Sequence, residues 1–171
     1  MRAVLVALFL AFGVSACVTT VNHNTASGRP EVTIKAPADA VKSVIVGVSM
    51  NLGYTMKSDS QFQVILERDP NNILANVLLG SQYDSRVVAR MSVAFMQSNQ
   101  TTRAVLDLNM VTNPGSAFER LTPMTNSQDA GKFQVVLNDI RAGLESGKPP
   151  AQVTEEVTAA IKARKAAEAK S

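Results

Sequence analysis

The sequence predicts an α+β domain in which an antiparallel sheet of about four or five strands carries two helices on one face. Three observations support this fold class. Several segments alternate apolar and polar residues, two longer segments repeat apolar residues every three or four positions, and short polar stretches join neighbouring strands. The expected order is strand, helix, strand, short helix, strand, strand, helix. Apolar residues make up 46% of the chain and aromatic residues only 5%, so the core should be aliphatic.

The first strand and helix are expected within residues 31–53. Residues 31–36 alternate as a strand with one buried face does. Pro37 then suits the first turn of a helix, where its missing N–H costs nothing. Gly53 follows the last apolar residue and suits a left-handed end to that helix. The apolar stripe of this helix consists of Val41, Val44, Ile45, Val48 and Leu52.

The middle of the chain should supply most of the sheet. Residues 54–68 are predicted as one extended segment, followed by a short helix over 69–79 that ends at Gly80. Residues 87–95 and 104–110 alternate on either side of a polar turn at 98–101, which predicts an antiparallel hairpin. Residues 118–124 are expected to continue or edge the sheet.

A second helix should follow, capped by Asn126 or Ser127 and closed by Gly147. Because the strands appear half polar, both helices should pack on the same sheet face. The stripe of this helix consists of Phe133, Val136, Leu137, Ile140 and Leu144.

Residues 148–171 begin with a Pro-Pro breaker and continue as an Ala/Lys/Glu-rich helix or disordered tail. Val153, Val157 and Ile161 form a thin apolar stripe with little to bury. The sequence leaves two interpretations open, a solvated helix and a helix that docks on a partner.

The first residues have the features of a bacterial export signal. Arg2 is followed by an uncharged apolar stretch over 4–14, too short to cross a bilayer as a helix. Val14-Ser15-Ala16-Cys17 comes next and resembles the lipobox, the recognition sequence of bacterial lipoprotein signal peptidase. The resemblance implies that residues 1–16 are removed and that Cys17 receives a diacylglycerol on its sulfur and a further acyl chain, such as palmitate, on its amino group.

The same resemblance implies a location in the cell envelope. Val18 follows the cysteine where an aspartate would resemble an inner-membrane retention signal, which points to the inner leaflet of the outer membrane, facing the periplasm. Residues 17–30 are then expected as a flexible tether, with His23 a solvated linker residue. Residues 31–147 form the domain. The helix–sheet order is similar to helix-grip-like domains of outer-membrane lipoproteins, including accessory lipoproteins of barrel-assembly machinery.

The composition excludes several classes of function. Cys17 and His23 are the only cysteine and histidine, which excludes an intrachain disulfide, a Cys/His zinc site and a histidine-based triad in the domain. Glu67 and Asp69 are close in sequence, but a solvated strand end explains them. We therefore expect no catalytic residues, no metal and no cofactor, and a formal charge of +3 gives no reason to expect nucleic-acid binding.

The expected role is that of a non-enzymatic protein-binding or assembly module, attached to the membrane by its lipid and bound to an envelope protein. The alternative is a binder of a small apolar ligand or lipid held between sheet and helices. Polar loop residues around 69–85 are the preferred partner-binding surface. The candidate residues there are Asn71, Asn72, Asn76, Gln82, Tyr83 and Asp84.

Overall fold

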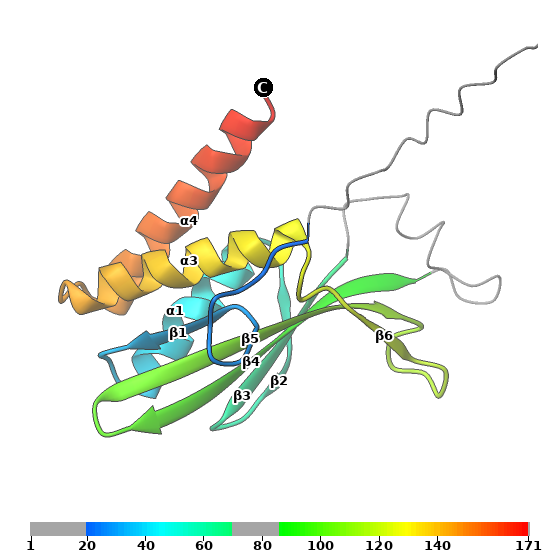
Figure 1. Cartoon of the computed structure of the whole chain (residues 1–171), viewed down its shortest axis with the longest axis horizontal. Coiled ribbons are helices and arrows are strands. Elements are labelled where there is room, and N and C mark those ends of the chain that lie inside the picture. Colours follow the sequence, from blue (N-terminus) through cyan, green and yellow to red (C-terminus); the bar gives the residue numbers. More distant parts are fainter. Residues whose placement is uncertain (1–19, 70–85, 171) are drawn as a thin grey trace, which may run out of the picture.

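The chain folds as an α+β domain, which confirms the predicted fold class (Figure 1). The computed structural model describes residues 20–69 and 86–170. The expected short helix over 69–79 therefore lies almost entirely outside the described residues. The elements are β1 (Glu31–Ile34), α1 (Ala38–Asn51), β2 (Thr55–Asp59), β3 (Gln63–Arg68), β4 (Val87–Ser98), β5 (Thr101–Thr112), β6 (Arg120–Pro123), α3 (Gln128–Glu145) and α4 (Pro150–Glu168).

The strands form one antiparallel sheet of six strands, rather than four or five. The order across the sheet is β1-β5-β4-β3-β2, and β6 pairs with β5 on the same edge as β1. β1 pairs with the first part of β5 and β6 with its last part. The predicted hairpin is present as β4 and β5, which are longer than expected and run the length of the sheet.

The segment predicted as one strand over 54–68 is a hairpin, so that prediction was wrong. β2 ends at Asp59 and the chain reverses before β3. Ser60 closes the turn, because its N–H donates to the carbonyl oxygen of Gln63 at 2.9 Å and its hydroxyl donates to the same oxygen. The turn contains neither Gly nor Pro, which are the residues that usually mark one in a sequence.

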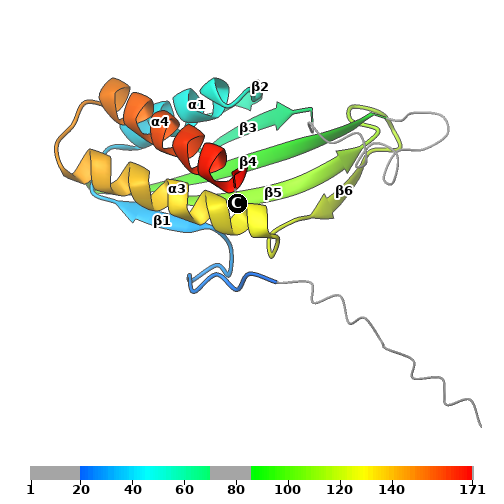
Figure 2. The same ribbon diagram turned by 90° about the horizontal axis from the view of Figure 1, so that it is seen from above.

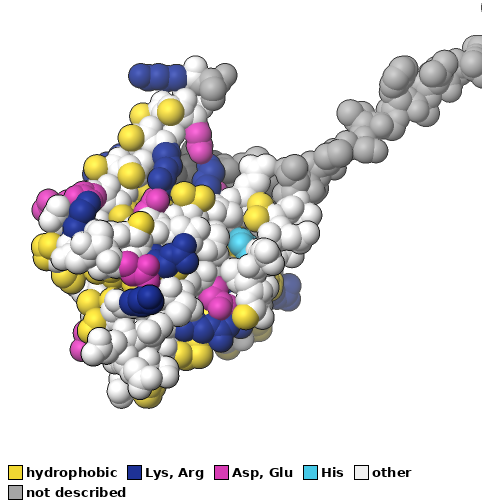
Figure 3. Space-filling model, turned by 60° about the vertical axis from the view of Figure 1, so that its left-hand side comes forward, with side chains coloured by type: hydrophobic (Ala, Val, Ile, Leu, Met, Phe, Trp, Pro, Cys, Tyr) yellow, Lys and Arg dark blue, Asp and Glu magenta, His cyan; other side chains and the backbone are white. Residues whose placement is uncertain are grey.

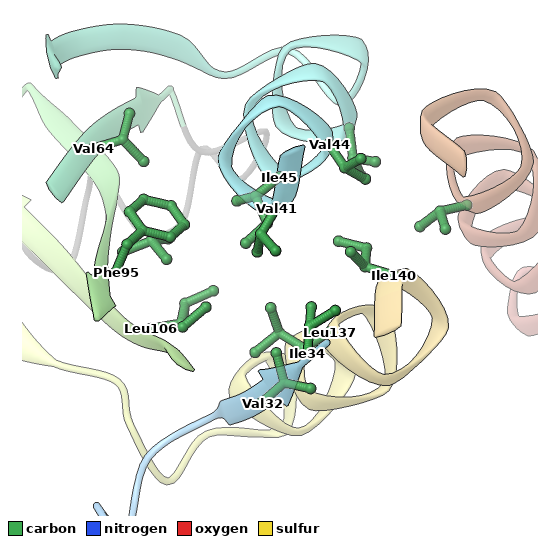
Figure 4. Close-up of a cluster of buried hydrophobic side chains, with 14 of the residues drawn as sticks. Val32, Ile34, Val41, Val44, Ile45, Val64, Phe95, Leu106, Leu137 and Ile140 are labelled. Atoms are coloured by element: carbon green, nitrogen blue, oxygen red, sulfur yellow. The ribbon is translucent and has the colours of Figure 1, made fainter. Parts of the chain in front are cut away.

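α1 and α3 cover the same face of the sheet, as predicted (Figure 2). Gly53 and Gly147 end their helices with φ of 86° and 81°, and the Ser127 hydroxyl caps α3 by accepting from the Ala130 N–H. Side chains from both layers meet in a close-packed aliphatic core (Figure 4). The labelled core residues are Val32, Ile34, Val41, Val44, Ile45, Val64, Phe95, Leu106, Leu137 and Ile140.

The first half of α4 packs on the outside of α1 and α3 and forms a third layer (Figure 2), whereas residues 162–168 are exposed. Val153 and Val157 are buried there. Close approach is possible because glycines lie opposite. A Cβ built on Gly47 would be 2.9 Å from Thr154 Cγ2, and one built on Gly143 would be 2.7 Å from Val153 Cγ1. The apolar stripe of this helix is therefore covered by its own domain.

Residues 20–30, which the sequence predicts as part of a tether, lie against the domain. The Val21 N–H donates to the Asn126 carbonyl oxygen at 2.9 Å. His23 is half-buried, with Nε2 2.7 Å from the Thr125 carbonyl oxygen, so it is not a solvated linker residue. The domain thus begins about ten residues before the first strand.

Candidate functional site

Within residues 20–69 and 86–170, no helix covers one face of the sheet, and we call it the open face. Its residues alternate with those that point into the core. Charged and polar side chains dominate its centre, whereas small apolar residues fill the positions between them. The members from the three central strands are Gln63, Ile65, Glu67, Val88, Arg90, Ser92, Ala94, Met96, Arg103, Val105, Asp107, Asn109 and Val111.

Arg90 lies at the centre of an ion-pair cluster on the open face. Its Nε donates to Glu67 Oε1 at 2.7 Å, and its two terminal nitrogens donate to the two oxygens of Glu119 at 2.6 and 3.0 Å. Lys57 Nζ lies 3.5 Å from the other oxygen of Glu67. Glu67 is only 5% exposed, so its charge needs these partners. Fork geometry of this kind holds both carboxylates in fixed positions.

The cluster also fixes the connection between β5 and β6. Glu119 accepts from the Gly115 N–H at 2.8 Å as well as from Arg90. These bonds, that from Arg90 first, hold the pKa of Glu119 at about 2, below its ordinary value of 4.5. The pKa of Arg90 is raised, chiefly by its bonds to Glu119. The charged states are therefore stable, which suits a structural clamp better than a proton-transfer group.

A second group of ion pairs lies toward β1. Arg103 donates to both oxygens of Glu31 at 2.7 and 2.8 Å, and these bonds hold the pKa of Glu31 at about 2. Arg29 Nη1 donates to Asp107 at 2.5 Å. On the side of the molecule shown in Figure 3, acidic and basic side chains lie next to one another rather than in patches of one sign. Such a surface gives little long-range attraction for a polyanion.

A hollow of about 310 Å³ lies beside the Arg90 cluster. Its lining residues are Lys57, Ile65, Glu67, Arg86, Arg90, Pro114 and Gly115. Glu67 and Glu119 already occupy the donors of Arg90. Arg90 is therefore engaged by carboxylates of the same chain where it lines the hollow.

The carboxylates considered from the sequence do not come together. Glu67 is buried in the Arg90 cluster, which corrects the expectation of a solvated strand end. Asp69 is exposed, with Oδ1 4.0 Å from Arg86 Nε, and Asp107 pairs with Arg29 on the same face but toward the β1 edge of the sheet. In the described ranges no three His, Cys, Asp or Glu side chains are grouped as metal ligands would be.

The remaining predicted site residues fall outside the described residues. These are Cys17 and the loop candidates Asn71, Asn72, Asn76, Gln82, Tyr83 and Asp84. Asp69 and Arg86, the described residues on either side of these loop candidates, lie within 4.0 Å of one another, and Arg86 lines the hollow. Of the helices within 20–69 and 86–170, none has the length and apolar content needed to span a bilayer.

Neither Arg90 nor Glu119 could be recognised as a site residue from the sequence pattern. Their only signal is that Arg90 interrupts an otherwise small and apolar stretch of β4, which indicates a side chain with a specific partner. The partner is 29 residues away and lies in a connection of irregular structure, so no periodic pattern links the two.

Comparison with known proteins gave no match. No protein-family model, curated protein or solved structure is significantly similar to this chain.

Proposed function

We propose that this protein is an envelope lipoprotein, anchored by acylated Cys17 in the inner leaflet of the bacterial outer membrane. The motif Val14-Ser15-Ala16-Cys17, after a charged start and a short apolar stretch, supports the anchor. Two or three acyl chains give stable attachment, because each buried methylene contributes about 0.8 kcal/mol.

We further propose that the domain acts as a non-enzymatic module that binds an envelope protein. The observation that carries this is the open face, a broad sheet surface with a hollow and with large apolar side chains exposed around it. Met96 on that face is 46% exposed, and Phe118, in the connection fixed by Glu119, is 77% exposed. Exposed apolar residues rimmed by polar ones are typical of protein-binding surfaces.

The alternative, a small apolar ligand held between sheet and helices, has less support. That space is filled by close-packed side chains, among them Ile34, Val41 and Val64, each 0% exposed. A ligand there would have to displace core residues, whereas Met96 and Phe118 are already exposed for a partner to contact.

Lipid attachment is tested by metabolic labelling with a fatty-acid analogue. The unchanged chain should be labelled and Cys17→Ser should not, since serine offers no thiol for diacylglycerol transfer. Equal labelling of both chains would contradict the anchor.

Partner binding is tested by a photocrosslinking amino acid placed in cells at Met96, on the open face. The matched control is Val135 of α3, which is equally exposed at 45% but lies in the helical layer. A discrete crosslinked protein at 96 and none at 135 is expected. Crosslinks at 135 alone would move the binding surface to the helices.

The absence of catalysis is tested on peptidoglycan, peptide and ester substrates. The full chain should show no turnover. Turnover that disappears in Glu67→Gln, Asp69→Asn or Asp107→Asn would show that the protein is an enzyme.

A further inference from the structure

We propose that the β1–β6 edge of the sheet faces the membrane, so that β2 is the strand farthest from the bilayer. The inference rests on the proposed acylation of Cys17. It concerns the orientation that such an anchor would impose. The surface that the β1–β6 edge contacts is the lipid bilayer.

The first step is the length of chain between the anchor and the domain. Val21 is held by its hydrogen bond to the Asn126 carbonyl oxygen. Its side chain packs on the start of α3, where a Cβ built on Gly131 would be 3.3 Å from Val21 Cγ2. Only residues 18–20 separate Val21 from Cys17. At about 3.3–3.6 Å per residue, four steps span at most about 14 Å.

The second step is the place where this short connection joins the domain. Thr125 and Asn126 follow β6 directly, and residues 20–30 lead into β1. β1 and β6 occupy the same edge of β5, and residues 20–30 lie along that edge in Figure 2. An anchor at Cys17 therefore holds the point where Val21 joins the domain, beside the end of β6, within about 14 Å of the lipid headgroups.

The third step is the strand order. β2 lies at the opposite edge of the sheet, four strand spacings from β1. At about 4.8 Å per spacing, β2 stands about 19 Å farther from the edge that is anchored. This separation exceeds the reach of the connection, so an inverted placement, with β2 against the bilayer and the β1–β6 edge above it, is excluded while Val21 stays bound.

On the β1–β6 edge, the outward backbone groups of Glu31 are satisfied without a partner strand. Gln134 of α3 pairs with the outer side of β1, where its Oε1 accepts from the Glu31 N–H at 2.8 Å and its Nε2 donates to the Glu31 carbonyl oxygen at 3.0 Å. On β6, Arg120 and Leu121 are exposed. A guanidinium and an apolar side chain fit a surface of phosphate headgroups over hydrocarbon.

The experiment uses the full acylated chain in vesicles of phosphatidylethanolamine and phosphatidylglycerol. Because acylation blocks the Cys17 thiol, one added cysteine carries the only fluorophore. Thr122→Cys on β6 and Ser58→Cys on β2 are matched, since both replace a small exposed hydroxyl residue in an edge strand. Quenching by a nitroxide on the lipid headgroup should be several-fold stronger at 122 than at 58.

A longer connection provides the control. A Gly/Ser insertion of about 20 residues between Thr19 and Thr20 adds an average reach of about 25 Å. Quenching at 122 should then fall toward the value at 58. If the large difference persisted, the short connection would not be its cause and the inference would be overturned.

The failure of this inference is distinguishable from that of the proposed function. Equal quenching at the two sites in a chain whose intact mass includes the acyl groups would overturn the orientation and leave the lipoprotein assignment standing. An intact mass without acyl groups, together with failure to float with the vesicles, would overturn both.

Discussion

Replacing Gly143 by alanine tests whether α4 is a packed part of the domain. In an isolated or solvated helix the change should stabilise, since alanine is favoured over glycine by about 1 kcal/mol in a helix interior. In the structure, the new Cβ would lie 2.7 Å from Val153 Cγ1 and 3.0 Å from Val153 Cγ2. Both values are shorter than a van der Waals contact, and valine has no flexible end that can move aside.

The expected result is a loss of stability. Overpacking of this kind costs about 1–3 kcal/mol, which outweighs or cancels the gain from helix propensity. We expect Gly143→Ala to lower the free energy of unfolding by up to about 2 kcal/mol. The measurement is urea unfolding, followed by circular dichroism, of a chain that starts at Thr20, with an unchanged slope as the check on two-state behaviour.

A double-mutant cycle isolates the contact. Val153→Ala alone should destabilise by about 2 kcal/mol, through lost burial and the cavity that it leaves. In that background Gly143→Ala should become favourable by about 1 kcal/mol, because only helix propensity remains. Ala142→Gly, at the exposed neighbouring position, measures the propensity effect in the same helix. A stabilising Gly143→Ala in the unchanged chain would refute the packing of α4.

Other predictions concern the core and the charged clusters. Ile140→Asp should unfold the domain or sharply lower its Tm, because Ile140 is 1% exposed and an unpaired charge there costs several kcal/mol. Val135→Asp on the same helix should change Tm little. Equal effects of the two substitutions would mean that the buried face of α3 has been assigned incorrectly. The folded-state pKa of Glu119 and of Glu31 is about 2, below the ordinary 4.5, so their ion pairs stabilise the fold above pH 4.5 and this contribution is lost as pH falls toward 2. Glu119→Gln should therefore flatten the dependence of urea stability on pH in that window, and an unchanged dependence would show that the bond to Arg90 contributes nothing.

Much of the fold could be predicted because its signals are local. Alternation located β1 and the hairpin of β4 and β5, and apolar stripes located α1 and α3 with their capping residues. The β2–β3 turn was missed because its polar residues carry no glycine or proline. The packing of α4 was missed because its narrow apolar stripe predicts burial only when the helix surface that it packs against is known. That surface depends on glycines in two other helices.

The sequence by itself determined the fold class, the aliphatic core and the motif at Cys17, because each depends on residues near one another in the chain. The tertiary structure decided which charges meet. Arg90 pairs with Glu67 across adjacent strands and with Glu119 in a later connection, and Val21 binds Asn126 more than a hundred residues away. Those contacts define the open face and the point at which the chain enters the domain. They depend on strand order and register, which a periodic pattern of apolar residues does not encode.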